Sequence, residues 1–394
     1  MLNSEWTYGV ETFNRIASKH LTRSGTSPIL VSLDLRCAET ADLARGILDV
    51  IRPHMARCYS FAILVPQIEW ISLIDRQLSE MSAVKIKSLT LGYEPTTSWI
   101  AAYVHSKIWR QVKPILHTVA VESLPSTVPR LMLPTVKVFE YNQFQNLYSQ
   151  SQETAAITPM SDLWRMLRHV PDIEDLNVTY SSLSIPEEDF RSGIETRITL
   201  CNLSSLTVGH IDAEYARVLM GSINAPRLDK LVLRCIPIWY HQDVWTVPTT
   251  WISRLRTLVL EGFRILEGNP MISLTRLLVA TKGLKTLSIK TPATDNTNRV
   301  AVQHLFNALS NPSPAGEWLC PSMAEFTLGH CNLVTGTELL SFVRNREQTS
   351  TVSDIRVLSI LNCATLDLDT LDELECLVPT VTYVAPQPLQ PPRM

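Results

Sequence analysis

The chain has 394 residues, of which 45% are hydrophobic, so it can bury a substantial core and is not intrinsically disordered. Its 35 Lys and Arg residues are balanced by 38 Asp and Glu residues, and the net charge of −3 gives no overall basic excess for nucleic acid or anionic lipid. The sequence lacks a secretion signal and any stretch of about 18 uncharged apolar residues, so we expect a cytoplasmic or nuclear protein outside the membrane.

Residues 1–27 are expected to form an N-terminal helix and a linker that cap the rest of the protein. From residue 28 onward a six-residue pattern, L-x-x-L-x-L, recurs along the chain, and Leu228, Leu231 and Leu233 show it most clearly. The first residues of its copies are Leu30, Cys58, Ile86, Leu116, Leu133, Ile173, Leu203, Leu228, Leu255, Leu284, Met323 and Ile355. Most steps between these residues lie near the leucine-rich-repeat range, whose upper end is about 29 residues.

Segments with helical spacing lie between the copies, because their apolar residues recur at i, i+3 and i+4. These segments are 39–51, 69–81, 96–112, 160–170, 212–223, 273–281, 297–309 and 336–346. Two irregular steps, of 17 and 40 residues, surround Leu133, and a polar insertion at 141–159 accounts for the longer one. Residues 366–384 are typical of a final acidic helix and a short strand, and 385–394 of a flexible Pro-rich tail.

The recurring strand, turn and helix predict an α/β leucine-rich-repeat solenoid over residues 28–384. It would have about twelve irregular repeats of roughly 25–40 residues, with a curved parallel sheet inside and helices outside. Each strand needs a neighbour for its backbone hydrogen bonds, so stacked repeats close the core. An ordinary doubly wound α/β protein is the alternative, but it does not explain a six-residue pattern that recurs at a near-constant step.

The pattern also predicts which side chains stay exposed. If the fourth and sixth residues of a copy are buried, the third, fifth and seventh alternate to the opposite, concave face. Three successive copies carry charge at the seventh position, in Arg234, Glu261 and Lys290. The candidate protein-binding residues of this face are Phe139, Lys230, Arg234, Glu261, Lys290 and Glu325. The alternative is that the charged residues are simply solvated on a large surface.

No catalytic pattern with a defined mechanism is present. The phosphate-binding G-x-x-x-x-G-K-[ST], the H-E-x-x-H and the G-x-S-x-G motifs are all missing, and the nine histidines include no pair at i, i+4. The eight cysteines include no C-x-x-C pair, which favours reduced, buried thiols over disulfides or a zinc site. We therefore predict that the protein is not an enzyme and has no catalytic residues, no metal and no cofactor.

Two N-terminal segments carry a family resemblance. The first, FNRIASKHLTRSGTSPILVSLDL (13–35), has a helix end, Pro28 and an alternating strand; the second, RPHMARCYSFAI (52–63), is a basic helix end that leads into the next strand. They resemble the region that follows the F-box in mushroom-type (basidiomycete) fungal F-box proteins with leucine-rich repeats. The resemblance implies that the repeats recruit a protein substrate and that a preceding F-box docks on the adaptor of a cullin ubiquitin ligase.

The residues before Phe13 lack the Leu-Pro-x-Glu opening of an F-box, so the adaptor subunit is expected as a partner only if an F-box lies upstream. We predict a non-enzymatic protein-binding protein that is the substrate-recognition part of an F-box (SCF) ubiquitin ligase. Its partner would be a protein substrate of unknown identity, without nucleic acid or membrane. A free-standing leucine-rich-repeat scaffold or inhibitor, with no ligase link, is the alternative.

Overall fold

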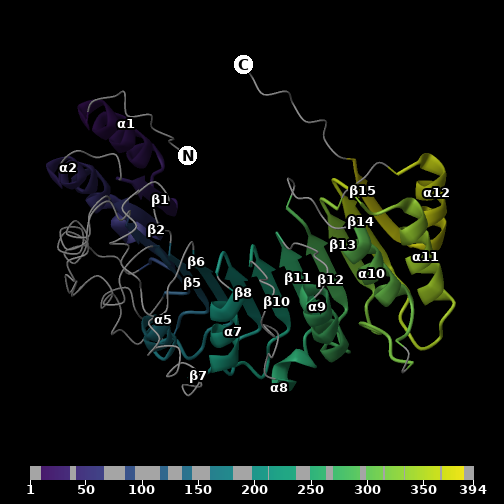
Figure 1. Ribbon diagram of the computed structural model, residues 1–394. Coiled ribbons are helices and arrows are strands. Elements are labelled where there is room, and N and C mark those ends of the chain that lie inside the picture. The colour runs from purple at the N-terminus through teal and green to yellow at the C-terminus, as the bar shows by residue number, and fades with distance from the viewer. Residues whose placement is uncertain are drawn as a thin grey trace, which may run out of the picture. The chain divides into compact units, whose positions relative to one another are not determined.

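The chain divides into two compact units, Met1–Ser192 (the first unit) and Gly193–Met394 (the second unit). Figure 1 shows their helices and strands. The computed structural model describes residues 10–35, 41–65, 85–93, 116–122, 135–143, 160–180, 198–211, 213–236, 249–262, 269–292, 299–313, 316–331, 333–363 and 366–385.

In the first unit, six strands adjoin in chain order and run parallel to one another. The strands are β1 (Ile29–Asp34), β2 (Cys58–Val65), β3 (Ser88–Tyr93), β4 (Thr118–Glu122), β5 (Val138–Gln143) and β6 (Asp175–Tyr180). The helices are α1 (Val10–Arg23), α2 (Ala41–Ile51), the 3-10 helix η1 (Arg52–Arg57) and α5 (Met160–Leu167).

In the second unit, a run of parallel strands again follows chain order. These strands are β8 (Ser205–Gly209), β10 (Lys230–Arg234), β11 (Thr257–Glu261), β12 (Thr286–Lys290), β13 (Glu325–Gly329), β14 (Val357–Leu361) and β15 (Thr380–Val384). The helices are α7 (Ala213–Ser222), α8 (Thr249–Ile252), α9 (Asn269–Ala280), α10 (Arg299–Ser310), α11 (Gly336–Glu347) and α12 (Leu368–Leu377). A small separate sheet pairs β7 (Ile198–Thr199) with β9 (Ile223–Asn224).

This alternation of strand and helix confirms the predicted α/β leucine-rich-repeat solenoid. Strand order follows chain order without the reversal that a doubly wound sheet requires. In the second unit, α9, α10, α11 and α12 lie side by side along the sheet (Figure 1). The final helix and strand predicted within 366–384 are confirmed as α12 and β15.

Most predicted helices are present, but 69–81 and 96–112 lie outside the described residues, as does most of the predicted tail. The domain boundaries after residues 27 and 384 stay predictions. Within the described residues, no helix has the length and apolar character needed to cross a membrane.

In most repeats the core is the predicted apolar triplet. In β10, Leu231 and Leu233 are no more than 3% exposed, and Leu228, which precedes the strand, is 1% exposed. Leu231 lies in register between Leu206 of β8 and Leu258 of β11, so equivalent leucines of successive repeats stack. The stacking places apolar side chains on the helix side of the sheet and buries them there.

Two copies of the pattern were placed in the wrong register. In β5 the copy predicted to begin at Leu133 puts Phe139 on the open face, but Phe139 is 1% exposed and pairs with the buried Val119 of β4. The correct triplet is Val136, Phe139 and Tyr141. The prediction of Phe139 as a binding residue is therefore wrong, because an aromatic side chain takes the core position that a leucine takes elsewhere.

The first copy is displaced in the opposite direction. Leu30 was expected to be buried but is 77% exposed, whereas Val31 and Leu33 are buried. Val31 pairs with Phe61 and Leu33 with Ile63, and the register shifts between Ile29 and Leu30. The strand therefore fits the repeat two residues earlier than its leucines indicate.

In several repeats of the second unit, the residue that follows the strand has a positive backbone φ angle. Residues with positive φ at this point are His210, Cys235, Gly262, His330 and Asn362. Four of these residues donate their backbone N–H to the end of the next strand, as Cys235 does to the carbonyl of Glu261 (2.7 Å). Cys331 and Cys363 follow one position later and are buried, as predicted, but Cys235 is exposed and does not tuck into the core.

Replacing Gly262 by Ala is expected to lower the free energy of unfolding by about 1–3 kcal/mol, because φ is +64° and a Cβ would lie 2.6 Å from Cys235 Sγ. The matched control is Gly221→Ala, which adds a methyl group within α7 where no atom outside the helix lies within 4 Å. That change should be neutral or stabilising by about 0.5–1 kcal/mol. Urea unfolding of both variants checks this, and equal effects would contradict it.

Arg57 joins the two N-terminal segments that carry the family resemblance. From the end of η1, its guanidinium donates to Ser24 Oγ (2.7 Å), to the carbonyl of Ser27 (3.1 Å) and to the carbonyl of Leu21 at the end of α1. Its other close neighbour is His54 Nδ1, at 3.1 Å. Burial and the charge of Arg57 both lower the pKa of His54, which favours the neutral ring next to the guanidinium. The helix, its turn and the second repeat thus form one local structure.

Arg346 is a fully buried cation at the last turn of α11. Its guanidinium donates to five backbone carbonyls, those of Leu309, Leu319, Cys320, Pro321 and Met323, over 3.0–3.5 Å. The ring of Phe342 lies one turn earlier, 5.9 Å from the guanidinium carbon. The side chain therefore ties α11 to the end of α10 and to the segment that leads into β13.

Candidate protein-binding surface

Three of the predicted binding residues form a charged row on the open face of the second unit. Parallel register places Arg234 opposite Glu261 and Glu261 opposite Lys290, at the ends of β10, β11 and β12. Arg234 Nε lies 2.7 Å from Glu261 Oε2, and Lys290 Nζ lies 3.3 Å from Glu261 Oε1. We call these three residues the charged ladder.

The ladder is charged at neutral pH and partly open to solvent. Burial alone would raise the pKa of Glu261, but the hydrogen bonds and charges of Lys290 and Arg234 outweigh it and lower that pKa. Glu261 therefore keeps its negative charge at neutral pH. Its two ion pairs weaken only as the pH falls through the lowered pKa of Glu261. The side chains of Arg234, Glu261 and Lys290 are 44%, 28% and 37% exposed.

Gly329 makes room for one end of the ladder. It lies opposite Lys290 in β13, and a Cβ at this position would be 2.9 Å from Lys290 Cγ. The missing side chain lets the aliphatic part of Lys290 lie across the neighbouring strand while its ammonium group reaches Glu261. Gly329 of the neighbouring strand thus helps to position the lysine, together with the ion pair to Glu261.

The other two predicted charges lie at the opposite ends of the strands. Lys230 and Glu325 are exposed at the starts of β10 and β13. Glu325 Oε2 accepts a hydrogen bond from Thr286 Oγ1 at 2.9 Å. Lys230 and Arg234 are separated by about 13 Å along the strand, at about 3.3 Å per residue, so they do not form one compact cluster.

The middle of this face is less open than the pattern predicted. Thr207, Val232 and Ser288 occupy fifth positions and alternate away from the core, yet they are 9%, 4% and 7% exposed. A partner that contacts this face would therefore meet mainly the longer side chains at the third and seventh positions.

The corrected register gives the first unit a different surface. Glu140 now takes the fifth position of β5, where burial and, to a smaller extent, the charge of Asp175 raise its pKa. Lys137 precedes the strand and pairs with Glu174 at 3.0 Å.

Sequence reasoning missed a basic cluster in the segments that lead into three strands of the second unit. Arg227, Arg254, Arg256 and Lys285 line a groove there. The available signal was position within the repeat, since these residues lie immediately before or after the first apolar residue of three successive copies. These residues do not occupy the third, fifth or seventh positions from which the concave face was predicted.

A leucine-rich-repeat array supports protein binding, because stacked strands present an extended surface of side chains with little chemistry of their own. In this chain the alternating charges of the ladder can pair with charges of opposite sign on a partner. Both cations keep N–H donors beyond those used for Glu261.

Comparisons with known proteins add little to this assignment. No protein-family model matches the chain. No curated protein matches it closely enough to count as a relative. A solved structure described as a TLR13–ssRNA13 complex is similar to 86% of this chain with 12% sequence identity and a TM-score of 0.42. The match covers only 40% of that longer chain, and a likeness at this level carries no argument about function.

Proposed function

We propose that the protein binds a partner protein through the open face of its second unit and serves as the substrate-recognition part of an F-box (SCF) ubiquitin ligase. The observation that carries the binding half is the charged ladder, in which register alone brings three separated charges into one row. Exposed ion pairs of this kind contribute little to stability, about 0–1 kcal/mol each, so their value lies in recognition.

The ligase half rests on the resemblance of the N-terminal segments to F-box proteins. Arg57 supports it, because the contacts of this residue join those two segments into one structure. In the proposed arrangement, the repeats hold the substrate while an F-box upstream docks on the adaptor. No catalytic group is required of this chain, since such a receptor acts by bringing two proteins together.

Neutralising the ladder should weaken substrate binding without unfolding the chain. We expect Arg234→Gln combined with Lys290→Gln to reduce recovery of the bound protein about tenfold in affinity purification, equivalent to about 1.4 kcal/mol. Glutamine keeps hydrogen-bonding capacity and avoids the three adjacent carboxylates that charge reversal would create. The control is Lys85→Gln with Arg168→Gln, two exposed cations of the first unit.

Quantitative mass spectrometry of material recovered with each variant is the measurement. A substrate that the ladder variant retains as well as the control does would contradict binding at this face. Recovery of the cullin and its adaptor with the full-length gene product tests the ligase half separately. Their absence, with the substrate still bound, would favour the free-standing scaffold or inhibitor.

A further inference from the structure

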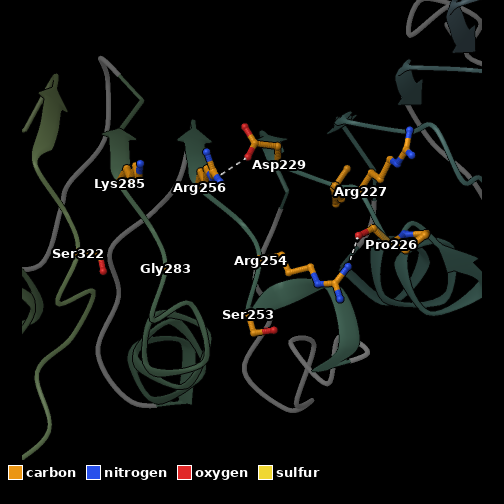
Figure 2. A pocket seen from close by; sticks show the side chains of 10 residues that line it. Pro226, Arg227, Asp229, Ser253, Arg254, Arg256, Gly283, Lys285 and Ser322 are labelled. Carbon is orange, nitrogen blue, oxygen red and sulfur yellow. Dashed lines mark hydrogen bonds and ion pairs between the residues drawn. The ribbon is translucent and has the colours of Figure 1, made fainter.

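A groove of about 480 Å³ lies in the second unit at the segments that lead into β10, β11 and β12 (Figure 2). We call it the basic groove. Its lining residues are Pro226, Arg227, Leu228, Asp229, Ser253, Arg254, Arg256, Gly283, Lys285 and Ser322. The charged ladder lies at the other end of the same strands, so the basic groove is a separate surface.

The groove has an excess of positive charge in a chain whose net charge is −3. Four cationic side chains line it against one carboxylate, that of Asp229. Arg256 Nε lies 3.4 Å from Asp229 Oδ1, and both side chains are more than half exposed. This pair cancels one positive charge and leaves three.

Two of the remaining three cations, Arg254 and Arg227, are held by neutral partners. Arg254 donates through one Nη to the carbonyl of Pro226 at 2.9 Å, a contact that Figure 2 shows as a dashed line. Arg227 donates through one Nη to Asn202 Oδ1 at 3.3 Å. Each guanidinium has five N–H groups, so both keep donors for an incoming anion while the neutral contacts fix their direction.

The spacing of the cations suits an extended peptide. Arg256 and Lys285 precede paired residues of β11 and β12, so their backbones are about 4.8 Å apart, and the three strands at the groove span roughly 10 Å. Side chains on one face of an extended peptide recur about every 6.6–6.8 Å, so two carboxylates fit within this span.

We propose that the basic groove binds an extended acidic segment of a partner protein, whose carboxylates pair with Arg227, Arg254 and Lys285. Charge complementarity favours this ligand. Nucleic acid fits less well, because none of the lining residues is aromatic and no ring is present for bases to stack on. The ligand is recognised without the charged ladder, so the proposal does not depend on the function assigned to that surface.

The test uses the full chain and a fluorescein-labelled peptide of five Glu-Ser repeats, in which every glutamate lies on one face when extended. We expect binding that weakens as salt concentration rises, and a Kd at least tenfold higher for the peptide of five Gln-Ser repeats. Arg254→Glu combined with Lys285→Glu should raise the Kd for the acidic peptide at least tenfold. The milder pair Arg254→Gln and Lys285→Gln should give a smaller rise and guards against misfolding, which circular dichroism checks.

The matched control is Lys85→Glu with Arg168→Glu, which changes the net charge equally on exposed residues of the first unit. An unchanged Kd in this control supports the groove, whereas an equal loss would show that only net charge matters and would overturn the proposal. Tighter binding of a ten-nucleotide single-stranded DNA, lost in the groove variant, would also overturn it. Arg234→Gln combined with Lys290→Gln, the variant of the charged ladder, should bind the peptide normally. Failure of the basic-groove proposal is therefore distinguishable from failure of the proposed function.

Discussion

Replacing Arg346 by Ala is expected to lower the free energy of unfolding by about 3–5 kcal/mol, the range typical of breaking a buried charged contact. The side chain is fully buried, and its guanidinium donates to five carbonyls, the shortest contact being 3.0 Å to Cys320. Truncation removes all five of these hydrogen bonds and opens a cavity beside Phe342, and within the described residues only the carbonyls of Cys320 and Pro321 keep a backbone N–H donor, from Met323 and Ser353. The loss affects two neighbouring segments at once, because the carbonyls belong to the end of α10 and to the segment before β13.

The control is on the same helix. Arg344 is 48% exposed and pairs with Glu373 of α12, so Arg344→Ala should cost less than about 1 kcal/mol. Arg346→Met, which keeps most of the volume without the hydrogen bonds, should fall between the two. Chemical denaturation gives the free energies, and hydrogen exchange of α10 and α11 locates the loss. Similar values for Arg344→Ala and Arg346→Ala would contradict the assigned role.

Burial of Arg346 carries a desolvation cost in addition to the stability that its hydrogen bonds contribute. Loss of hydration lowers the pKa of Arg346, and the nearby Cys320 and Asp354 offset only part of that effect. Its Nε has no acceptor within the described part of the chain. The contacts that remain are therefore essential, since a buried guanidinium without them would lie unpaired.

Replacing Phe139 by Ala is the second large effect, about 3–5 kcal/mol, because the ring is 1% exposed and stacks 6.4 Å from Tyr141. Val138→Ala should cost less than about 1 kcal/mol, because Val138 lies on the opposite, partly exposed side of β5. The two registers give opposite rankings, since the pattern that begins at Leu133 buries Val138 and exposes Phe139. Denaturant unfolding of both variants decides between them, and a larger loss for Val138→Ala would support the register that the structure rejects.

The repeat pattern predicted most of the fold because burial in parallel strands leaves a period of two in the sequence. Leu231 and Leu233 follow it, and so the charged residue after them was assigned correctly to the open face. The pattern failed where several apolar residues offered more than one register, as around Leu133 and Val138. Only pairing with the preceding strand β4, Val119 with Phe139, selects one of them.

Other features depend on contacts that no local pattern contains. Arg346, in the last turn of a helix, has the position of a solvated cation, and only the folding of two neighbouring segments around it makes it a core residue. The ion pairs of Glu261 were likewise not predicted, although their strand positions were. Alternation along a strand predicts the face on which a side chain lies. The distance between two charged side chains also depends on the register of their strands and, for Lys290, on the space left by Gly329.

The charged ladder has a consequence for how the sequence can change over generations. Its members are 27 and 29 residues apart along the chain, one in each of three successive repeats. Loss of Glu261 would leave Arg234 and Lys290, on either side of β11, without their shared counter-charge, while loss of either cation would remove one of the carboxylate's counter-charges. Related chains that keep the ladder should therefore substitute positions 234, 261 and 290 together, as a single inherited unit, while the loops between them vary freely in length.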